Sequence, residues 1–398
     1  MTDWQIHPRN ADLSRTFDPI SGWAQLVLVE RHNTPDTWTV TGPASALSLF
    51  TPGMGCILDQ NGAQVTSGQA TGISRSGTVV NGRPVESMTV AFASDLAPFG
   101  DRIVRPTPAK PLTAAITTFP DAYDLRSGAV ETLILGYINS HIGAGALADR
   151  RLARLRLPTS QGRGGTTQVS GRLDNLGVLV QSLAEAGNLR VTVQHVEDVD
   201  GAWLDLVIEL SRNLSDNVRF GTAESTSAGL ISEWSYDISA PTSTRPMVGL
   251  GGELEAREFL ELRDTAAETL WSRTVETFVD QRGIAPDSED KLAEATRAGQ
   301  EALDAGKGPV KVSFVPLLGP DLVYRRDVRV GDIVGYDLPG LDPAEDKIRE
   351  ATTTVSVEPS QATERVQVVV GTPDAPQTRS QQQAAKALRG ITAIERAQ

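Results

Sequence analysis

The chain has 398 residues, of which 39% are hydrophobic, and a formal net charge of −13 at pH 7. This length exceeds what one hydrophobic core usually organises, so we expect several domains, and the acidic balance excludes a phosphate-binding surface built from Lys and Arg. Cys56 is the one cysteine, so no internal disulfide forms and we expect a buried structural thiol.

Residues 1–110 contain short stretches of alternating polar and apolar residues, such as "WAQLVLVERHN" and "TWTVTGPASALSLF". Asn61-Gly62 and Asn81-Gly82 are hairpin turn signals between such stretches. The pattern predicts a small antiparallel β-barrel, which the proline-rich linker "RPTPAKP" ends.

Residues 111–212 have the pattern of an α+β domain. In "SGAVETLILGYINSHIG" and "GRLDNLGVLVQSLAEAG" the apolar residues recur every three or four positions, including Leu173 at the start of the second stretch, which predicts two amphipathic helices. The next stretch, "NLRVTVQHVEDVDGAWLDLVIELS", predicts a hairpin that turns at Asp200-Gly201.

The strand pattern returns in residues 213–260 and again in 308–372, which predicts a second barrel that is split in sequence. Between its halves, residues 261–307 predict inserted helices at "ETLWSRTVETFVDQRG" and "SEDKLAEATRAGQEALDAG". We expect "YRRDVRVGDIVGYDLPG" to form a strand, a Gly-Asp turn and a second strand. Residues 373–398 predict a linker and a short amphipathic helix. The expected class is therefore α+β, mainly β.

No catalytic, cofactor-binding or metal-ligating residues are predicted, and we expect no enzyme. The four histidines, His7, His32, His141 and His195, are far apart and outside metal-ligand spacing. The stretch "TGISRSG" misses the spacing of a serine-nucleophile elbow. The paired carboxylates of "EDVDGAW" could serve acid-base catalysis, but we interpret this stretch as the tip of a hairpin at Asp200-Gly201. Three tryptophans in apolar-periodic stretches are expected in the core: Trp203, Trp234 and Trp271.

The order of these parts resembles the tail-hub (baseplate hub) proteins of long-tailed phages, especially the siphovirus minor tail proteins of phages that infect actinobacteria. The resemblance covers roughly residues 15–372. It rests on "TWTVTGPAS", "GAVETLILGYINSHIG", "RPMVGLGGELEAR", "LWSRTVETFVDQRG" and "VRVGDIVGYDLPG". The echo between "GMGCILD" and "VGDIVGYD" indicates that the two predicted barrels are related.

The resemblance implies a structural virion protein at the tail tip, made in the host bacterial cytoplasm. It implies a homotrimer of two tail-tube-like barrels per chain, which adapts the sixfold tail tube to a threefold spike or fibre. The implied partners are a distal tail protein or the tube above, the spike or fibre protein below, and the tape measure protein in the lumen. DNA passes through without specific binding, and neither a cofactor nor stable membrane insertion is expected.

Two other functions stay open. A receptor- or glycan-binding tail protein would expose an aromatic cluster such as one at Trp203 or Trp234. A hydrolase of the host envelope would show turnover on cell-wall material. Some hub proteins carry a peptidase or lysozyme-like extension, for which we expect no room before Gln398.

Overall fold

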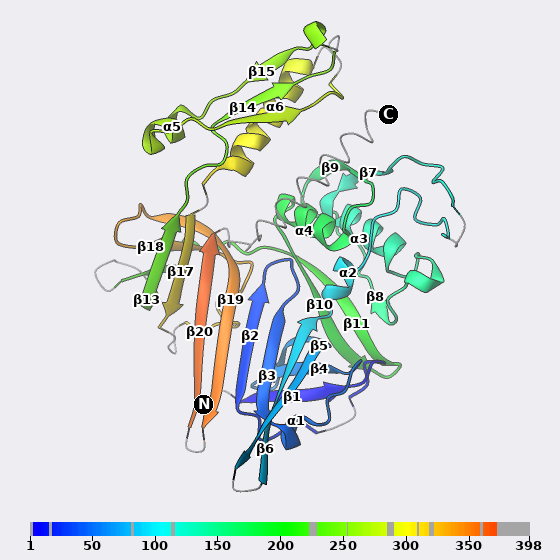
Figure 1. Cartoon of the computed structure of the whole chain (residues 1–398), viewed down its shortest axis with the longest axis vertical. Coiled ribbons are helices and arrows are strands. Elements are labelled where there is room, and N and C mark those ends of the chain that lie inside the picture. The colour runs from blue at the N-terminus through cyan, green and yellow to red at the C-terminus, as the bar shows by residue number, and fades with distance from the viewer. Residues whose placement is uncertain are drawn as a thin grey trace. The chain divides into compact units, whose positions relative to one another are not determined.

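The computed structural model describes residues 3–15, 18–80, 83–112, 116–222, 229–252, 254–284, 290–308, 310–317, 322–358 and 361–371. The chain divides into two compact units. Unit 1 contains Met1–Glu233 and Phe314–Val370, and unit 2 contains Trp234–Ser313 with 371–398. Strands outnumber helices throughout the described residues (Figure 1), which confirms the predicted α+β, mainly β class.

The first β unit contains β1 (Trp4–Arg9), β2 (Gln25–Arg31), β3 (Thr37–Pro43), β4 (Gly55–Gln60), β5 (Ala63–Val80) and β6 (Arg83–Ser94), with the short helices α1 (Ala44–Leu47) and α2 (Ala97–Gly100). The strands pair antiparallel in the order β1-β4-β5-β6-β3-β2. Trp4 from one end of this order and Leu28 from the other lie in the same core. The sheet therefore curls around a single core, as a barrel does.

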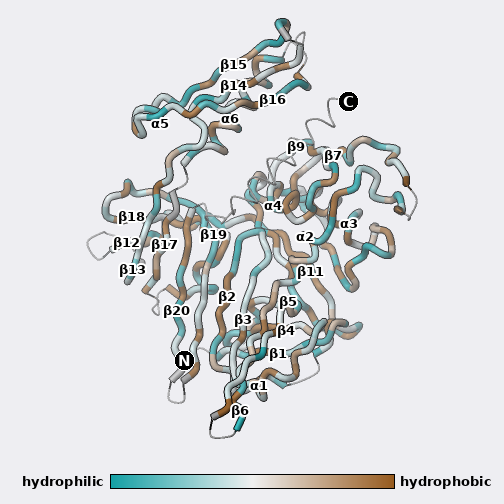
Figure 2. Tube along the Cα trace, viewed as in Figure 1, coloured by the Kyte–Doolittle hydropathy of each residue, from teal (hydrophilic) through white to brown (hydrophobic). Residues whose placement is uncertain are grey.

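Local sequence explains these strands. Alternating residues of β3 are buried, and Trp38 of β3 stacks on Phe92 of β6 with ring centroids 5.3 Å apart. Asn61 and Gly62 have φ of 53° and 78°, the left-handed values that the tight turn between β4 and β5 requires. The Asn81-Gly82 turn lies outside the described residues. Hydrophobic and hydrophilic segments alternate along these strands in Figure 2.

The second β unit contains β12 (Arg219–Gly221), β13 (Gly229–Ile238), β17 (Val310–Pro316), β18 (Ile333–Asp337), β19 (Ala344–Glu358) and β20 (Gln361–Gly371). Its strands pair in the order β19-β18-β12-β13-β17-β20, and β20 pairs again with β19. The pairing thus closes a ring of six strands. β12 runs parallel to β13 and to β18, which differs from the purely antiparallel barrel that we expected.

The two β units form one continuous sheet. β2 pairs antiparallel with β19 over seven residues, from Gln25 opposite Ser356 to Arg31 opposite Glu350. An ion pair of 3.1 Å between Arg31 Nε and Glu350 Oε2 lies at one end of this seam. Because β19 pairs with β18, β20 and β2, it belongs to both β units (Figure 1).

The α+β domain contains β7 (Asp124–Ala129), α3 (Val130–His141), η1 (Ala148–Arg150), β8 (Leu155–Arg156), β9 (Thr166–Gly171), α4 (Leu176–Ala186), β10 (Leu189–Asp198) and β11 (Gly201–Leu210). The two predicted helices and the hairpin at Asp200-Gly201 are confirmed. α3 and α4 pack with β10 and β11 in one core. Leu173 was expected on the apolar face of the second helix, but it precedes α4 and is exposed, since Asn175 caps the helix.

Unit 2 contains β14 (Arg245–Gly249), η2 (Leu254–Ala256), β15 (Phe259–Glu261), α5 (Thr265–Trp271), β16 (Glu276–Asp280) and α6 (Lys291–Gly306). The strands pair in the order β15-β14-β16. Val248 and Leu250 pack with Ala295 and Ala298 of α6 in a small core. The predicted second barrel included residues 239–260, but the strands in that stretch, β14 and the start of β15, belong to this separate sheet. The domain boundaries drawn from the sequence stay a prediction.

The single helix predicted for residues 268–283 is wrong. α5 ends at Trp271, where Ser272 adopts a left-handed φ of 48°, and the chain continues as β16. The stretch from Thr274 to Val279 is rich in β-branched and aromatic residues, which favour a strand when a neighbouring strand is available. β14 supplies that neighbour, because it pairs in parallel with all five residues of β16.

The strand expected before Gly331 is also wrong. Only the second half of the predicted pair forms, as β18, and residues 325–327 are turn. Asp327 explains the turn, because its carboxylate accepts a hydrogen bond from the Val323 backbone N–H at 2.7 Å and its own N–H donates to the Val323 carbonyl at 2.9 Å. The Asp332 carboxylate accepts hydrogen bonds from the Arg329 backbone N–H at 2.8 Å and from the Arg212 side chain, which hold the chain just before β18. Gly331 has φ of 96°, so the Gly-Asp pair bends the chain just before β18.

Candidate functional site

The four histidines do not converge on one site. His7 lies 3.3 Å from Asp59, and His32 lies 3.3 Å from Glu185. His141 accepts a hydrogen bond from the Arg105 backbone, and His195 contacts the Leu13 carbonyl. Burial lowers the pKa of all four rings, and it lowers that of His32 to about 3. These side chains are packed, neutral groups in separate parts of unit 1.

Cys56 lies on β4 and is fully buried, as predicted. Burial raises the pKa of the Cys56 thiol far above its ordinary range, so the thiolate that a nucleophile needs does not form. The stretch "TGISRSG" lies on β5, within its hairpin with β6. Asp200 lies at the exposed tip of the β10–β11 hairpin, where its N–H donates to Asp198 at 2.9 Å.

The prediction that Trp203, Trp234 and Trp271 lie in the core is wrong. Trp234 is 39% exposed and lies parallel to Tyr236, with ring centroids 5.9 Å apart. Trp203 and Trp271 are half-buried, and Trp203 lies against the guanidinium of Arg156. Trp203 and Trp234 lie on strands whose opposite face carries buried residues, and sequence periodicity does not tell the two faces apart. Trp271 lies on α5, which has no buried side chain.

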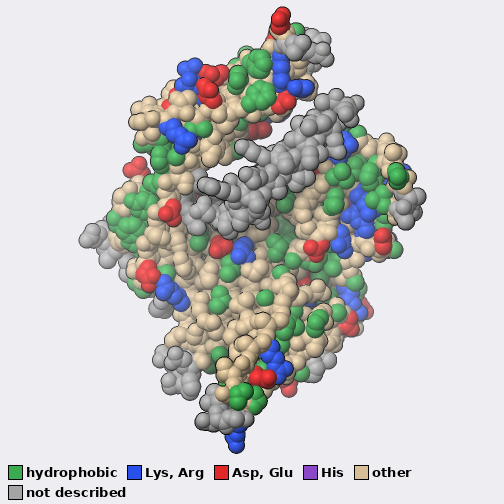
Figure 3. All heavy atoms as spheres, viewed as in Figure 1, with side chains coloured by type: hydrophobic (Ala, Val, Ile, Leu, Met, Phe, Trp, Pro, Cys, Tyr) green, Lys and Arg blue, Asp and Glu red, His purple; other side chains and the backbone are tan. Residues whose placement is uncertain are grey.

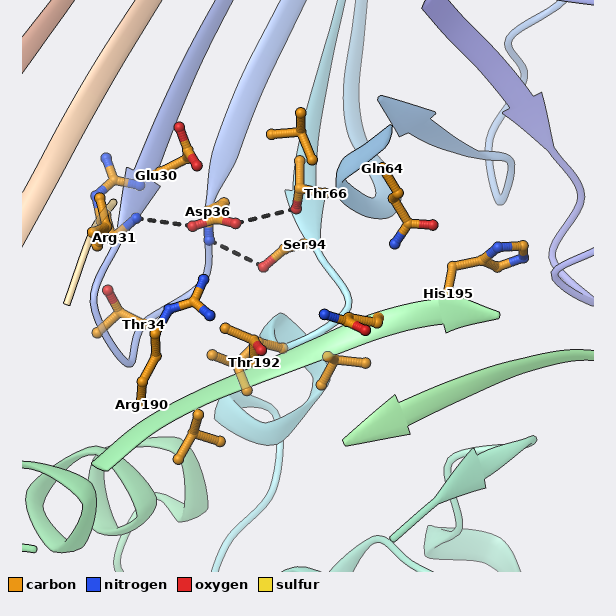
Figure 4. A pocket seen from close by; sticks show the side chains of 16 residues that line it. Glu30, Arg31, Thr34, Asp36, Gln64, Thr66, Ser94, Arg190, Thr192 and His195 are labelled. Atoms are coloured by element: carbon orange, nitrogen blue, oxygen red, sulfur yellow. Dashed lines mark hydrogen bonds between the residues drawn. The ribbon is translucent and has the colours of Figure 1, made fainter. Parts of the chain in front are cut away.

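A polar cavity of about 190 Å³ lies between the first β unit and β10 of the α+β domain. Figure 4 shows the Arg190 side chain of β10 extending toward Asp36 of the β2–β3 loop. Thr34, Thr66 and Ser94 also line the cavity. A second, mostly apolar cavity of about 160 Å³ lies nearby. No motif in the sequence marks these residues, because they come together only through packing of two domains.

Asp36 is the most perturbed carboxyl group of the polar cavity. It accepts hydrogen bonds from the Arg31 backbone N–H at 2.9 Å and from the Thr66 hydroxyl at 3.1 Å, and its own N–H donates to Ser94 Oγ at 3.0 Å. Burial, with a smaller contribution from the nearby Glu30 carboxylate, raises the pKa of Asp36 to about 7. Asp36 therefore changes charge near neutral pH.

The charged groups around the cavity bind each other. Glu30 pairs with Arg325 at 2.6 Å, and Glu209 pairs with Arg329 at 2.6 Å and with Arg190 at 3.5 Å. These contacts join the first β unit, the α+β domain and the segment before β18. The arrangement offers no paired acid and base around an activated nucleophile. These ion pairs hold the domains together.

A second junction holds the loop after β2. The Asn33 side chain donates to the Leu189 carbonyl at 2.9 Å and accepts from the Val191 N–H at 2.8 Å. Glu185 of α4 accepts from Arg349 of β19 at 2.5 Å. The α+β domain is thus fixed to both β units by buried or half-buried polar contacts.

Within the described residues, no group of three or more His, Cys, Asp or Glu side chains is arranged to hold a metal ion. In the same residues, every helix is too short or too polar to cross a membrane.

Comparison with known families identifies the chain's relatives. The model of a family described as "Siphovirus ReqiPepy6 Gp37-like protein" matches residues 3–372. The chain belongs to this family. The Gp37-like family is a family of siphovirus tail proteins, so the predicted resemblance is confirmed and the protein is a structural component of the phage tail and of the virion. No curated protein matches the sequence.

Two solved structures have a similar fold. One is the tail protein from Neisseria meningitidis MC58, with a TM-score of 0.54 and 11% identity over 93% of this chain and 96% of that chain. The other is prophage tail protein gp18 from Listeria monocytogenes EGD-e, with a TM-score of 0.54 and 12% identity over 97% of this chain and 99% of that chain. At 11–12% identity, these two similarities show only that this Gp37-like chain has a similar fold.

Proposed function

We propose that this Gp37-like protein is the tail-tip or baseplate hub of its phage, a homotrimer that adapts the sixfold tail tube to a threefold spike or fibre. The observation that carries the proposal is the pairing of β2 with β19. It makes two β units, each with six strands, into one body within a single chain. Three copies then supply six β units around an axis, which is the count that a sixfold tube requires.

The ring encloses the channel through which DNA leaves the virion. The net charge of −13 supports this role, because an acidic wall repels the phosphate backbone and lets the duplex slide without specific binding. Acidic side chains of the two β units therefore face the channel. Above the ring lies the distal tail protein or the tube, below it the spike or fibre protein, and in the lumen the tape measure protein.

The hub acts through assembly and not through catalysis. In the described part of the chain, the Cys56 thiol is buried, the four histidines are separate, and the charged groups of the polar cavity are paired with each other. A turnover assay of the purified protein on host cell-wall material is expected to give no release of soluble fragments. Release that a single substitution abolishes would contradict this.

The exposed, parallel rings of Trp234 and Tyr236 favour a second candidate, a receptor- or glycan-binding tail protein. Aromatic faces stack on sugar rings, and such binding would quench tryptophan fluorescence. Titration with host cell-wall glycans, with Trp234→Ala as the control, distinguishes this candidate from the hub.

Sedimentation velocity and negative-stain imaging of the purified chain test the hub. We expect a species of three times the chain's mass and class averages of a ring with a hole wide enough for duplex DNA. Single chains at every concentration, or a particle closed on its threefold axis, would contradict the proposal.

A further inference from the structure

The sheet of unit 2 has a helix on one face. Val248 packs with Ala295 and Ala298 of α6 in the small core of unit 2, so α6 covers the face on which Val248 lies. Side chains alternate between the two faces along a strand, and residues opposite each other on paired strands share a face. The other face therefore carries Met247 and, opposite it, Phe278. We call this the open face of unit 2.

Large apolar side chains lie uncovered on the open face. Met247 is 43%, Phe259 54% and Phe278 53% exposed. Gly249 lies opposite Phe259, and because it has no side chain the Phe278 ring lies directly against it. Figure 3 shows hydrophobic side chains grouped over β14 and β15 at the upper end of the view, with charged ones around them. An exposed apolar patch with a polar rim is typical of a contact surface.

The chain after β20 begins at the edge of the second β unit to which unit 2 is attached. β13 and β18 both run parallel to β12, and β19 runs antiparallel to β18 and to β20. β13 and β20 therefore run in the same direction, and β17 lies between them. Unit 2 joins the end of β13 and the start of β17, where Gly308 lies against Ser239. The end of β20 lies at this same edge.

Residues 372–398 follow β20 and lie outside the described residues, so the helix expected among them stays a prediction. Its apolar stripe comprises Ala384, Leu388, Ile391 and Ile394. Lys386 and Arg389 lie on the opposite side of such a helix, which gives it the polar outer side of a helix that covers a surface patch. The stripe is about 15 Å long. A five-residue strand such as β14 is about 16 Å long, so the two lengths match.

The linker before this stripe is long enough to reach the open face. Residues 372–383 span up to about 40 Å when extended. α6 has 16 residues and is about 24 Å long, so the linker can follow unit 2 along its length from their common edge. A short flexible tether also holds the stripe at an effective concentration of about 1 mM. A modest apolar contact is therefore sufficient for docking.

We propose that residues 384–394 form an amphipathic helix that lies on the open face of unit 2 in the same chain. The apolar stripe of this helix covers Phe259 and Phe278, and its basic side stays in water. The sheet of unit 2 then has a helix on each face, so both of its apolar faces are buried. The inference goes beyond the hub and does not depend on the trimer.

Cysteine cross-linking tests the contact in the full chain, because the natural Cys56 is buried and does not compete. The double variant Met247→Cys, Ile391→Cys is treated with a short bismaleimide, and cross-linked peptides are identified by mass spectrometry. We expect a cross-link within one chain, at least tenfold more abundant than in the pair Met247→Cys, Ala393→Cys. Ala393 is the matched control because it lies on the side of the predicted helix opposite Ile391.

Two further pairs keep Ile391→Cys and move its partner. Leu292 is exposed on α6, and Val178 is exposed beside the apolar cavity of unit 1. Leu292→Cys and Val178→Cys are each expected to give at least tenfold less cross-link to Ile391→Cys than Met247→Cys gives. These pairs distinguish docking on the open face from random encounters of a tethered segment.

Hydrogen exchange tests the same contact without a reagent. A free helix of this length is marginal in water, so the amides of residues 384–394 are protected only when the segment is docked. We expect them to exchange at least tenfold more slowly in the natural chain than in a synthetic peptide of residues 381–398. Phe278→Asp should remove this protection, and Leu292→Asp, the control on α6, should leave it. Unchanged exchange of the α6 amides shows that unit 2 stays folded.

The outcomes decide between the open face and other positions of the segment. A cross-link to Val178→Cys that exceeds the one to Met247→Cys places the segment on unit 1 and overturns the proposal. Cross-links between chains in a mixture of the Met247→Cys and Ile391→Cys single variants assign the segment to a second copy and also overturn it. Exchange as fast as in the free peptide does the same. Sedimentation measures the trimer separately, so none of these results decides the hub.

Discussion

At the scale of single residues, buried or half-buried charges decide how the domains of unit 1 are joined. Asp36 and Arg190 both line the polar cavity, and Glu30 pairs with Arg325 from a segment almost 300 positions away. Such groups lose hydration on folding, so they are stable only where partners replace the water. Asp36 and Glu131, a buried carboxylate within the α+β domain, give measurable predictions.

Asp36→Asn is expected to change how stability depends on pH. The folded-state pKa of Asp36, about 7, is above the ordinary value of 3.8, so the folded protein binds the proton more tightly and its stability falls as pH rises from about 4 to 7. Removing the charge abolishes this loss. Urea unfolding should show the variant gaining about 2 kcal/mol over the natural chain between pH 5 and pH 8.

Asp200→Asn, at an exposed hairpin tip, is the control for that experiment and should leave the pH profile unchanged. Parallel profiles for the natural chain and Asp36→Asn would show that Asp36 titrates alike in the folded and unfolded states.

Glu131→Ala is expected to destabilise unit 1 by about 3 kcal/mol. Glu131 is fully buried at the start of α3 and accepts hydrogen bonds from the Arg163 side chain at 2.7 Å and from the Gln161 and Arg163 N–H groups at 3.0 Å. Bonding to Arg163 lowers the pKa of Glu131, so its contribution is present near neutral pH and is lost as pH falls through that lowered pKa.

Chemical denaturation at pH 7 measures the effect of Glu131→Ala. The matched control is Glu86→Ala, which removes an exposed partner of Arg75 and should cost less than about 1 kcal/mol. Equal losses in the two variants would contradict the role given to the buried pair.

At the scale of elements, the long hairpin β5–β6 has an inner half that belongs to the core and an outer half that is exposed. The inner half carries Met88 and Val90 into the core, whereas residues 72–79 and 83–87 are all exposed. The fold of the first β unit should therefore not depend on the outer half of this hairpin.

Replacement of residues 76–87 by Asn-Gly joins Arg75 to Met88, which already lie opposite each other, through a favoured two-residue turn. We expect the melting temperature to shift by less than about 3 °C, because no core contact is lost. A large drop in melting temperature would mean that the outer half of the hairpin supports the fold of its own chain.

At the scale of the whole molecule, a continuous twelve-stranded sheet runs through unit 1, and its strands β13 and β17 lead into and out of unit 2. The two ends of the insertion lie side by side, because β13 and β17 are neighbours in the sheet and Gly308 lies against Ser239. Because the two ends of the insertion are adjacent, unit 1 loses little loop-closure entropy by carrying it.

Replacement of residues 240–307 by a short Gly-Ser linker should therefore leave unit 1 folded. We expect circular dichroism to retain the strand signal and thermal unfolding to remain cooperative. As a control, the same linker in place of 344–358 removes β19, which joins the two β units, and should prevent folding. Loss of structure in the first deletion would show that unit 1 depends on unit 2.

The sequence by itself determined the elements whose signal is local. Period-two alternation with Asn-Gly or Asp-Gly turns fixed the β4–β5 and β10–β11 hairpins, and helical periodicity fixed α3 and α4. The order of these elements was enough to predict the phage tail family. The burial of Cys56 was also predicted from the sequence.

Only the tertiary structure decided the features that depend on partners distant in sequence. β16 is a strand because β14 lies beside it, Asp332 is held before β18 by Arg212, and Trp234 is exposed because no described residue buries it. The polar cavity around Asp36 exists only where two domains pack. Periodicity reports which face of an element is apolar, but packing alone determines what that face meets.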